Sequence, residues 1–205
     1  MIVDRFAKNL TAIEYPKYKT SWTFKLDKVN FYAYWNDAFT KEECEKIIQI
    51  AKNKGLVKGK TIGKSDVRKN KISWLYACDD IEWVFRRVTD IILNLNERFF
   101  GFDIFGLNEG FQFTNYKAPS DKYGKHIDRA LDFVVRKLSV SIQLTDPEEY
   151  EGGELYLYDG DKGKLMDKKQ GTLIMFPSYV LHEVMPVTKG ERNSLVTWVT
   201  GNQFK

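Results

Sequence analysis

The sequence has few cysteines and no long apolar run, and both shortages narrow its class. Its 205 residues include only two cysteines, Cys44 and Cys78, too few and too isolated for a disulfide framework or a zinc knuckle. The first residues, MIVDRFAKN, carry charges where a signal peptide has its apolar core, and no segment approaches the length of a membrane span. We therefore expect a protein of the reducing cytosol with no membrane partner.

A large excess of one charge is also missing. The 32 basic and 28 acidic residues are well mixed, and a net charge of +4 gives poor support to a nucleic-acid substrate. The densest basic run, KGKTIGKSDVRKNK, covers residues 58–71. Two interpretations of it stay open: a solvated loop, or a loop that closes over an acidic substrate or contacts nucleic acid. The hydrophobic fraction of 43% and the chain length predict one folded domain.

Two segments in the first hundred residues have the apolar spacing of helices. The first is TKEECEKIIQIAKNKG, in which Thr40 and Glu43 form a capping box and Gly55 supplies the stop. The second is DDIEWVFRRVTDIILNLNERFFG, where apolar residues recur at helical intervals until Gly101. Stripes of this kind pack in cores, so we expect both helices to support a sheet and to carry no chemistry.

From residue 111 onward the apolar period changes to two. In KLSVSIQLT, apolar side chains alternate with Ser139, Ser141 and Gln143, which predicts a strand with one apolar and one polar face. The segments GELYLY, GTLIMF and RNSLVTWVT follow as short strands between turn clusters such as DPEEYEGG. This spacing predicts a mainly β fold with supporting helices, and the natural candidate is the jelly roll, or double-stranded β-helix.

Histidine is as scarce as cysteine. His126 stands in GKHIDRA, and Asp128 follows two residues later, so both side chains project to one face of a locally extended chain. By itself this spacing is a weak signal, because such pairs often only share a hydrogen bond at a strand end. The second histidine, His182, stands in FPSYVLHEVMPV. Two histidines and one carboxylate form the facial triad of non-haem Fe(II) oxygenases, which leaves positions open for a 2-oxo acid and O2.

Arg192 adds a second feature ten residues after His182. It heads the strand RNSLVTWV, and a strand whose polar face points inward would aim this charge into the barrel. A buried guanidinium needs a partner, and its fork suits the distal carboxylate of a 2-oxo acid. The alternative is that Arg192 is exposed at a hairpin end and that His182 is a hydrogen-bonded core residue.

These residues lie in FQFTNYKAPSDKYGKHIDRA, RKLSVSIQLTDPEEYEGGELYLY and GTLIMFPSYVLHEVMPVTKGERNSLVTWV. Over residues 111–199 the chain resembles the 2-oxoglutarate- and Fe(II)-dependent dioxygenases of the prolyl 4-hydroxylase-like group, above all the PKHD-type hydroxylases. The resemblance is weaker over residues 31–110. It implies that His126, Asp128 and His182 bind iron, and that Arg192 and Tyr116 bind the distal carboxylate of 2-oxoglutarate.

The resemblance also implies an activity and a domain plan. Such an enzyme hydroxylates an unactivated C–H bond with Fe(II), 2-oxoglutarate and O2, releases succinate and CO2, and uses ascorbate as a reductant. The chain would be one dioxygenase domain over residues 1–205, with helical support and substrate-side elements in 1–110 and a jelly-roll core in 111–201.

The resemblance points to a peptide or protein substrate, with a peptidyl proline as the first candidate. Arg68 and Trp74, in KGKTIGKSDVRKNKISWLY, stand where such enzymes have their substrate groove, although an ordinary loop and edge strand fit as well. Three alternatives stay open: an oxygenase of a small metabolite, an oxygenase of nucleic acid, and a non-catalytic jelly-roll binding module.

Overall fold

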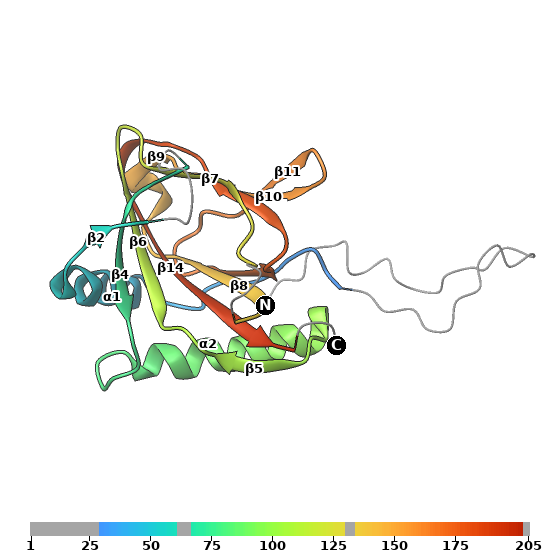
Figure 1. Cartoon of the computed structure of the whole chain (residues 1–205). Coiled ribbons are helices and arrows are strands. Elements are labelled where there is room, and N and C mark those ends of the chain that lie inside the picture. The colour runs from blue at the N-terminus through green and yellow to red at the C-terminus, as the bar shows by residue number, and fades with distance from the viewer. Residues whose placement is uncertain (1–28, 61–66, 130–133, 203–205) are drawn as a thin grey trace, which may run out of the picture.

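A computed structural model describes residues 29–60, 67–129 and 134–202, which form two antiparallel sheets and a layer of helices (Figure 1). The larger sheet has nine strands in the order β1-β12-β8-β14-β6-β4-β2, with β5 and β9 also paired to β14. These strands are β1 (Ala33–Trp35), β2 (Val57–Lys58), β4 (Lys71–Leu75), β5 (Ile104–Leu107), β6 (Phe111–Lys117), β8 (Arg136–Gln143), β9 (Tyr150–Gly152), β12 (Leu173–Pro177) and β14 (Val187–Gly201).

The smaller sheet has five strands in the order β11-β10-β13-β7-β3. They are β3 (Arg68–Lys69), β7 (Lys122–His126), β10 (Leu155–Asp159), β11 (Lys162–Leu165) and β13 (Leu181–Val184). Only Asn70 separates β3 from β4, so the chain passes there from the smaller sheet to the larger. A short 3-10 helix, η3 (Pro147–Glu149), precedes β9.

Helices cover the face of the larger sheet that points away from the smaller one (Figure 1). Helix α1 (Lys41–Lys54) begins with the predicted capping box: the Thr40 N–H donates to Glu43 Oε2 at 2.9 Å, and the Glu43 N–H donates to Thr40 Oγ1 at 3.3 Å. It ends at Gly55, whose φ of 99° favours glycine. No helix within the described residues is long and apolar enough to cross a membrane.

The second predicted helix is confirmed, but its last turn differs from a regular α-helix. Helix α2 (Glu82–Leu95) continues as a π-helical turn, η2 (Asn96–Phe100), and then Gly101 adopts a left-handed conformation. The Asn96 side chain accepts from the Phe102 N–H at 3.0 Å and donates to the Phe102 carbonyl at 2.8 Å. These bonds fasten the helix end to the following chain, a contact that apolar periodicity does not report.

Apolar and polar side chains alternate along β8. The apolar ones face the core beneath the helices, and the polar ones face the space between the two sheets. Its apolar residues and those of β14 pack with the helices in one core cluster, which includes Cys44, Ile47, Val88, Leu95, Phe113, Leu138, Val140, Ile142 and Leu195. A second cluster fills the space between the sheets with Tyr116, Leu157, Ile174, Phe176, Val180 and Val187. The polar residues of β8 face this second side, as the alternation predicts.

Part of the predicted basic loop is strand. Lys58 belongs to β2, Arg68 and Lys69 form β3, and Lys71 begins β4. Residues 61–66 of that run, and the N-terminal segment in which we found no signal peptide, lie outside the described residues.

Candidate metal centre and its pocket

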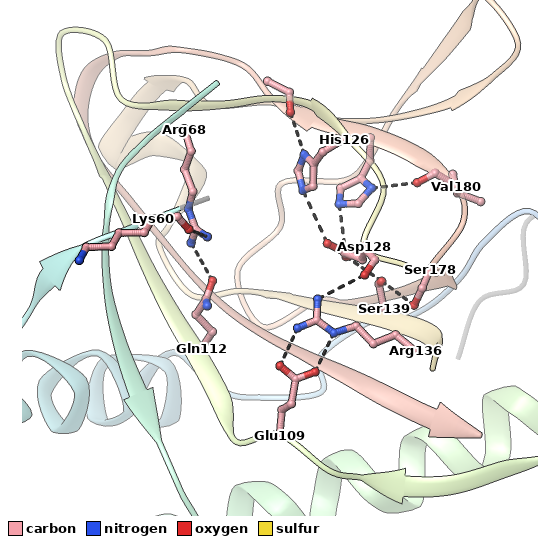
Figure 2. Close-up of polar contacts among 12 residues, drawn as sticks. Lys60, Arg68, Glu109, Gln112, His126, Asp128, Arg136, Ser139, Ser178 and Val180 are labelled. Atoms are coloured by element: carbon pink, nitrogen blue, oxygen red, sulfur yellow. Dashed lines mark hydrogen bonds and ion pairs between the residues drawn. The ribbon is translucent and has the colours of Figure 1, made fainter. Parts of the chain in front are cut away.

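Two adjacent strands of the smaller sheet bring the two histidines together. His126, the last residue of β7, lies directly opposite His182 of β13 in the antiparallel register. Asp128 follows β7, and its N–H donates to the Ser178 carbonyl at 3.0 Å, which holds the segment against the turn before β13. The His126 Nε2 lies 3.7 Å from Asp128 Oδ1, and the His182 Nε2 lies 3.4 Å from Asp128 Oδ2 (Figure 2).

Both imidazoles are oriented in the same way. The Nδ1 of His126 lies 2.7 Å from the Gly124 carbonyl, and the Nδ1 of His182 lies 2.9 Å from the Val180 carbonyl. A carbonyl only accepts, so each Nδ1 carries the proton and each Nε2 presents a lone pair toward Asp128. This is how a backbone carbonyl fixes the tautomer of a metal-binding histidine.

The protonation states of the two histidines and Asp128 favour the binding of a metal cation. Burial and the neighbouring His182 lower the pKa of His126 to about 4, so this ring is neutral at physiological pH. Burial alone would raise the pKa of Asp128, but the two histidines outweigh it and hold the pKa far below its usual range. Burial lowers the pKa of His182, but the adjacent Asp128 carboxylate more than offsets burial, so the pKa is raised overall. An ionised carboxylate and imidazole lone pairs within 4.8 Å of one another fit an Fe(II)-type ion.

Sequence reasoning missed the groups that hold Asp128. Ser139 Oγ donates to Asp128 Oδ2 at 2.7 Å and lies 3.0 Å from Ser178 Oγ. Arg136 donates to the Asp128 carbonyl at 3.3 Å and makes two bonds with the Glu109 carboxylate, at 2.7 and 2.6 Å (Figure 2). The polar face predicted for β8 was the available signal for Ser139. Glu109 lies 27 residues from Arg136, and nothing in the local sequence marks the pair.

Arg192 is buried beside Tyr116. The two residues are direct neighbours across β14 and β6, and each is 2% exposed. Arg192 donates to Gln143 Oε1 at 2.9 Å and to Ser194 Oγ at 3.3 Å, and its guanidinium lies 5.5 Å from the Tyr116 ring. Within the residues that the structure describes, no carboxylate contacts it. Arg192 therefore lies in the interior and not at an exposed hairpin end.

One cavity of about 480 Å³, its open mouth included, connects these groups. Arg68 and Trp198 also line this cavity, whereas Trp74 does not. The Trp74 ring instead packs against the Trp198 ring, with the centroids 6.2 Å apart. The Gln143 Nε2 is a buried polar atom without a hydrogen-bond partner in the described part of the chain. The lining includes His126, Asp128, His182, Arg192, Tyr116, Tyr123, Ser139, Phe176, Arg68 and Trp198.

Sequence comparison matches part of the C-terminal half of the chain to a family model. Residues 111–200 match the model of the 2OG-Fe(II) oxygenase superfamily. A PKHD-type hydroxylase of Alteromonas mediterranea is 38% identical over 92 residues, which are 42% of this chain and 41% of that protein. One of Nitrosomonas europaea is 34% identical over 87 residues, 39% of this chain and 38% of that protein. The chain thus matches about two fifths of the length of these curated relatives.

Structure comparison extends the likeness to most of the chain. A Pseudomonas putida prolyl-4-hydroxylase superposes with a TM-score of 0.65 at 20% identity, covering 84% of this chain and 94% of that one. A Trichoplax adhaerens prolyl hydroxylase, solved with a hypoxia inducible factor peptide fragment, gives 0.70 at 21% identity, with 84% of each chain covered. A viral collagen prolyl hydroxylase from Paramecium Bursaria Chlorella virus-1, solved with 2-oxoglutarate, gives 0.65 at 23% identity, covering 84% and 97%.

Residues 111–200 therefore match the 2OG-Fe(II) oxygenase superfamily model, and the chain shares its fold with solved prolyl hydroxylases.

Proposed function

We propose that this protein is an Fe(II)- and 2-oxoglutarate-dependent dioxygenase that hydroxylates an unactivated C–H bond of a peptidyl residue, with proline as the first candidate. In this proposal the chain is one domain whose sheets form a double-stranded β-helix. His126, Asp128 and His182 hold Fe(II), Arg192 and Tyr116 hold the distal carboxylate of 2-oxoglutarate, and ascorbate serves as reductant. The cytosolic location stays a prediction.

The observation that carries the proposal is the buried Arg192 in the same cavity as the triad. Among the described residues, its hydrogen-bond partners are the neutral side chains of Gln143, Ser194 and Tyr150. A guanidinium this deeply buried is destabilising unless an anion neutralises it, and its fork binds a carboxylate with two parallel bonds. A triad alone fits several enzymes, but a triad and an unneutralised arginine in one cavity fit a 2-oxo dicarboxylate.

The protein's own contribution is positioning. With bound 2-oxoglutarate and O2, Fe(II) supplies the oxidation that yields succinate, CO2 and the hydroxylated product. The Gly124 and Val180 carbonyls fix the imidazole rings, and Ser139 fixes one oxygen of Asp128. The Phe176 ring packs edge-on against His182 at 4.9 Å and excludes water from that side.

A peptide substrate is supported by the solved proteins that share this fold. The Trichoplax prolyl hydroxylase was solved with a peptide fragment, and the viral neighbour is described as a collagen prolyl hydroxylase. In this chain β2 and β3 are the outermost strands at one side of their sheets. Outermost strands offer backbone groups to an extended peptide, so a peptide segment has a place to bind beside the cavity.

The test is an anaerobic titration with Fe(II) and 2-oxoglutarate, followed by the weak visible charge-transfer band of a chelated 2-oxo acid. We expect the band in the wild type, its loss in Asp128→Ala and a large weakening in Arg192→Ala. Arg86→Ala is the matched control, because Arg86 is exposed on α2 and pairs only with Glu82 along the helix. A wild-type protein that binds neither iron nor 2-oxoglutarate would reject the proposal in favour of a non-catalytic binding module.

A further inference from the structure

A second buried guanidinium lines the cavity, and the proposed chemistry does not use it. Arg68 is 8% exposed. Its Nε donates to Asn70 Oδ1 at 2.9 Å, its Nη2 to Gln112 Oε1 at 2.7 Å, and its Nη1 to the Lys60 carbonyl at only 3.5 Å. All three acceptors are neutral, and among the described residues no carboxylate contacts Arg68.

Arg136 differs from Arg68 because its guanidinium is paired with a carboxylate. Arg136 donates from two nitrogens of its guanidinium to the Glu109 carboxylate, whereas the acceptors of Arg68 in the described part of the chain are amide and carbonyl oxygens (Figure 2). A guanidinium has five N–H donors, and three bonds from Arg68 leave one N–H on Nη1 and one on Nη2 without an acceptor in the described structure. The end of a guanidinium that carries Nη1 and Nη2 can bind the two oxygens of a carboxylate.

The surroundings of Arg68 hold it in place. A Cβ added to Gly59 would lie 2.1 Å from Asn70 Oδ1 and 2.8 Å from Arg68 Nε, so only glycine at position 59 leaves room for this pair. The Tyr123 ring lies 4.7 Å from the guanidinium on its other side. Asn70 is 3% exposed, and its Oδ1 is the acceptor for Arg68 Nε. The site therefore presents unused donors on a rigid support.

This site is close to the candidate iron centre. Arg68 and Tyr123 are direct neighbours across β3 and β7, and the Tyr123 ring stacks on the His126 imidazole with the centroids 3.5 Å apart. One aromatic ring thus separates the Arg68 guanidinium from a metal-ligand candidate. A group held by Arg68 would lie within a side chain's reach of the reacting C–H bond.

The strands around Arg68 are uniformly basic. Strands β2, β3, β4, β6 and β7 contain no aspartate or glutamate, and their basic residues are Lys58, Arg68, Lys69, Lys71, Lys117, Lys122 and Lys125. Two lysine pairs are direct cross-strand neighbours, Lys58 with Lys71 and Lys69 with Lys122, an arrangement that destabilises a sheet. Two acids outside these strands partly offset this charge: Asp121 pairs with Lys69 at 3.6 Å, and Glu191 of β14 lies opposite Lys117. Such a surface attracts an anionic partner.

We propose that Arg68, supported by Asn70 and Gln112, binds a carboxylate of the substrate, and that the substrate is an acidic peptide with an aspartate or glutamate next to the hydroxylated residue. This inference rests on the proposed function and specifies its substrate. Arg192 neutralises the cosubstrate, and Arg68 provides the second, separate anion site in the same cavity. A peptide fits better than a phosphate chain, because the adjacent strands at the sheet edges suit an extended backbone.

The experiment measures peptide binding to the protein loaded anaerobically with Fe(II) and 2-oxoglutarate. The probes are fluorescein-labelled pentapeptides with a central proline flanked on both sides by aspartate, asparagine or lysine. N-acetylaspartate and N-acetylasparagine serve as competitors that reveal a free acid as the source of the carboxylate, and a dT oligonucleotide tests a phosphate chain. We expect the aspartate peptide to bind at least about tenfold more tightly than the asparagine peptide at low salt, and added salt to narrow the gap.

Three variants test whether Arg68 causes the preference. Arg68→Gln should abolish the discrimination between aspartate and asparagine peptides, and Arg68→Glu should favour the lysine peptide. Lys162→Gln changes the net charge by the same unit on β11, at the opposite edge of the smaller sheet from β3, and should keep the wild-type preference. Lys162→Gln should also titrate with 2-oxoglutarate as the wild type does.

Each other result overturns the inference. Equal binding of the aspartate and asparagine probes by the wild type, or a preference that survives in Arg68→Gln, removes the role of Arg68. Weaker 2-oxoglutarate binding in Arg68→Gln with unchanged peptide selectivity would assign Arg68 to the cosubstrate. Tighter binding of the oligonucleotide than of any peptide would replace the acidic peptide by nucleic acid. Loss of the charge-transfer band in the wild type refutes the proposed function, whereas an intact band without carboxylate selectivity refutes only this inference.

Discussion

At the scale of single residues, the carboxylate of Asp128 is the most closely supported group of the candidate metal centre. Ser139 Oγ donates to Oδ2 at 2.7 Å, which leaves the lone pairs of the carboxylate in a fixed direction. Hydrogen bonds to metal ligands affect metal affinity by about ten- to a hundredfold. We predict that Ser139→Ala weakens Fe(II) binding by about that factor, measured by anaerobic calorimetry. Ser141→Ala, two residues further along the same face of β8, should bind Fe(II) as the wild type does, and equal weakening in both variants would contradict the prediction.

The individual site residues were accessible from sequence to different degrees. His126, Asp128 and His182 were predictable because the chain has few histidines and one of them stands in His-x-Asp spacing. Arg68 was named as a substrate residue on resemblance, but its neutral environment was invisible, because Gln112 lies 44 residues away along the chain. Contacts between residues so far apart depend on which strands become neighbours, and the local pattern does not encode this.

At the scale of elements, Glu43 links the two helices that back the larger sheet. It closes the capping box of α1 and also accepts from Arg87 of α2 at 2.5 and 2.8 Å. Hydrogen bonding to Arg87 lowers the pKa of Glu43, so the fold favours the ionised form. This stabilisation is present above the unfolded pKa near 4.5 and is lost as the pH falls through the lower folded value.

We therefore predict a pH-dependent effect of Glu43→Gln. At pH 7 the variant should lose about 1 kcal/mol of unfolding free energy, since the pair is partly exposed and an exposed ion pair contributes little more. In acid, below the lowered folded pKa of Glu43, the wild-type carboxylate is protonated too, and the two proteins should unfold at the same denaturant concentration. Arg86→Gln is the control for a more exposed ion pair within one helix, and a deficit of Glu43→Gln that persists in acid would show a steric cause instead.

The elements themselves were largely predictable, and their pairing was not. Thr40 and Glu43 predicted the start of α1, and the alternation in KLSVSIQLT predicted which face of β8 meets the helices. Nothing in either segment predicted that His126 on β7 would lie opposite His182 on β13. That register depends on the order of five strands in the smaller sheet, and the apolar period of a strand does not specify its neighbour.

At the scale of the whole molecule, the candidate site joins the two sheets. The histidines come from the smaller sheet, whereas Arg192, Tyr116 and Ser139 come from the larger one. A ligand held by both sheets binds the folded state only, so it stabilises the protein by about 2.7 kcal/mol at a hundredfold excess over its dissociation constant. The melting temperature therefore measures ligand binding to the histidines of the smaller sheet and to Arg192 of the larger sheet as separate increments.

We predict two additive increments of melting temperature, one from Fe(II) alone and a further one when 2-oxoglutarate is added, measured anaerobically by scanning calorimetry. Arg192→Ala should keep the first increment and lose the second, because it removes the anion partner in the larger sheet and leaves the histidines untouched. Asp128→Ala should lose both, since 2-oxoglutarate binding in this site depends on the metal. If Arg192→Ala instead abolished the response to Fe(II) alone, the two halves would not be separate, and the assignment of Arg192 to the cosubstrate would be wrong.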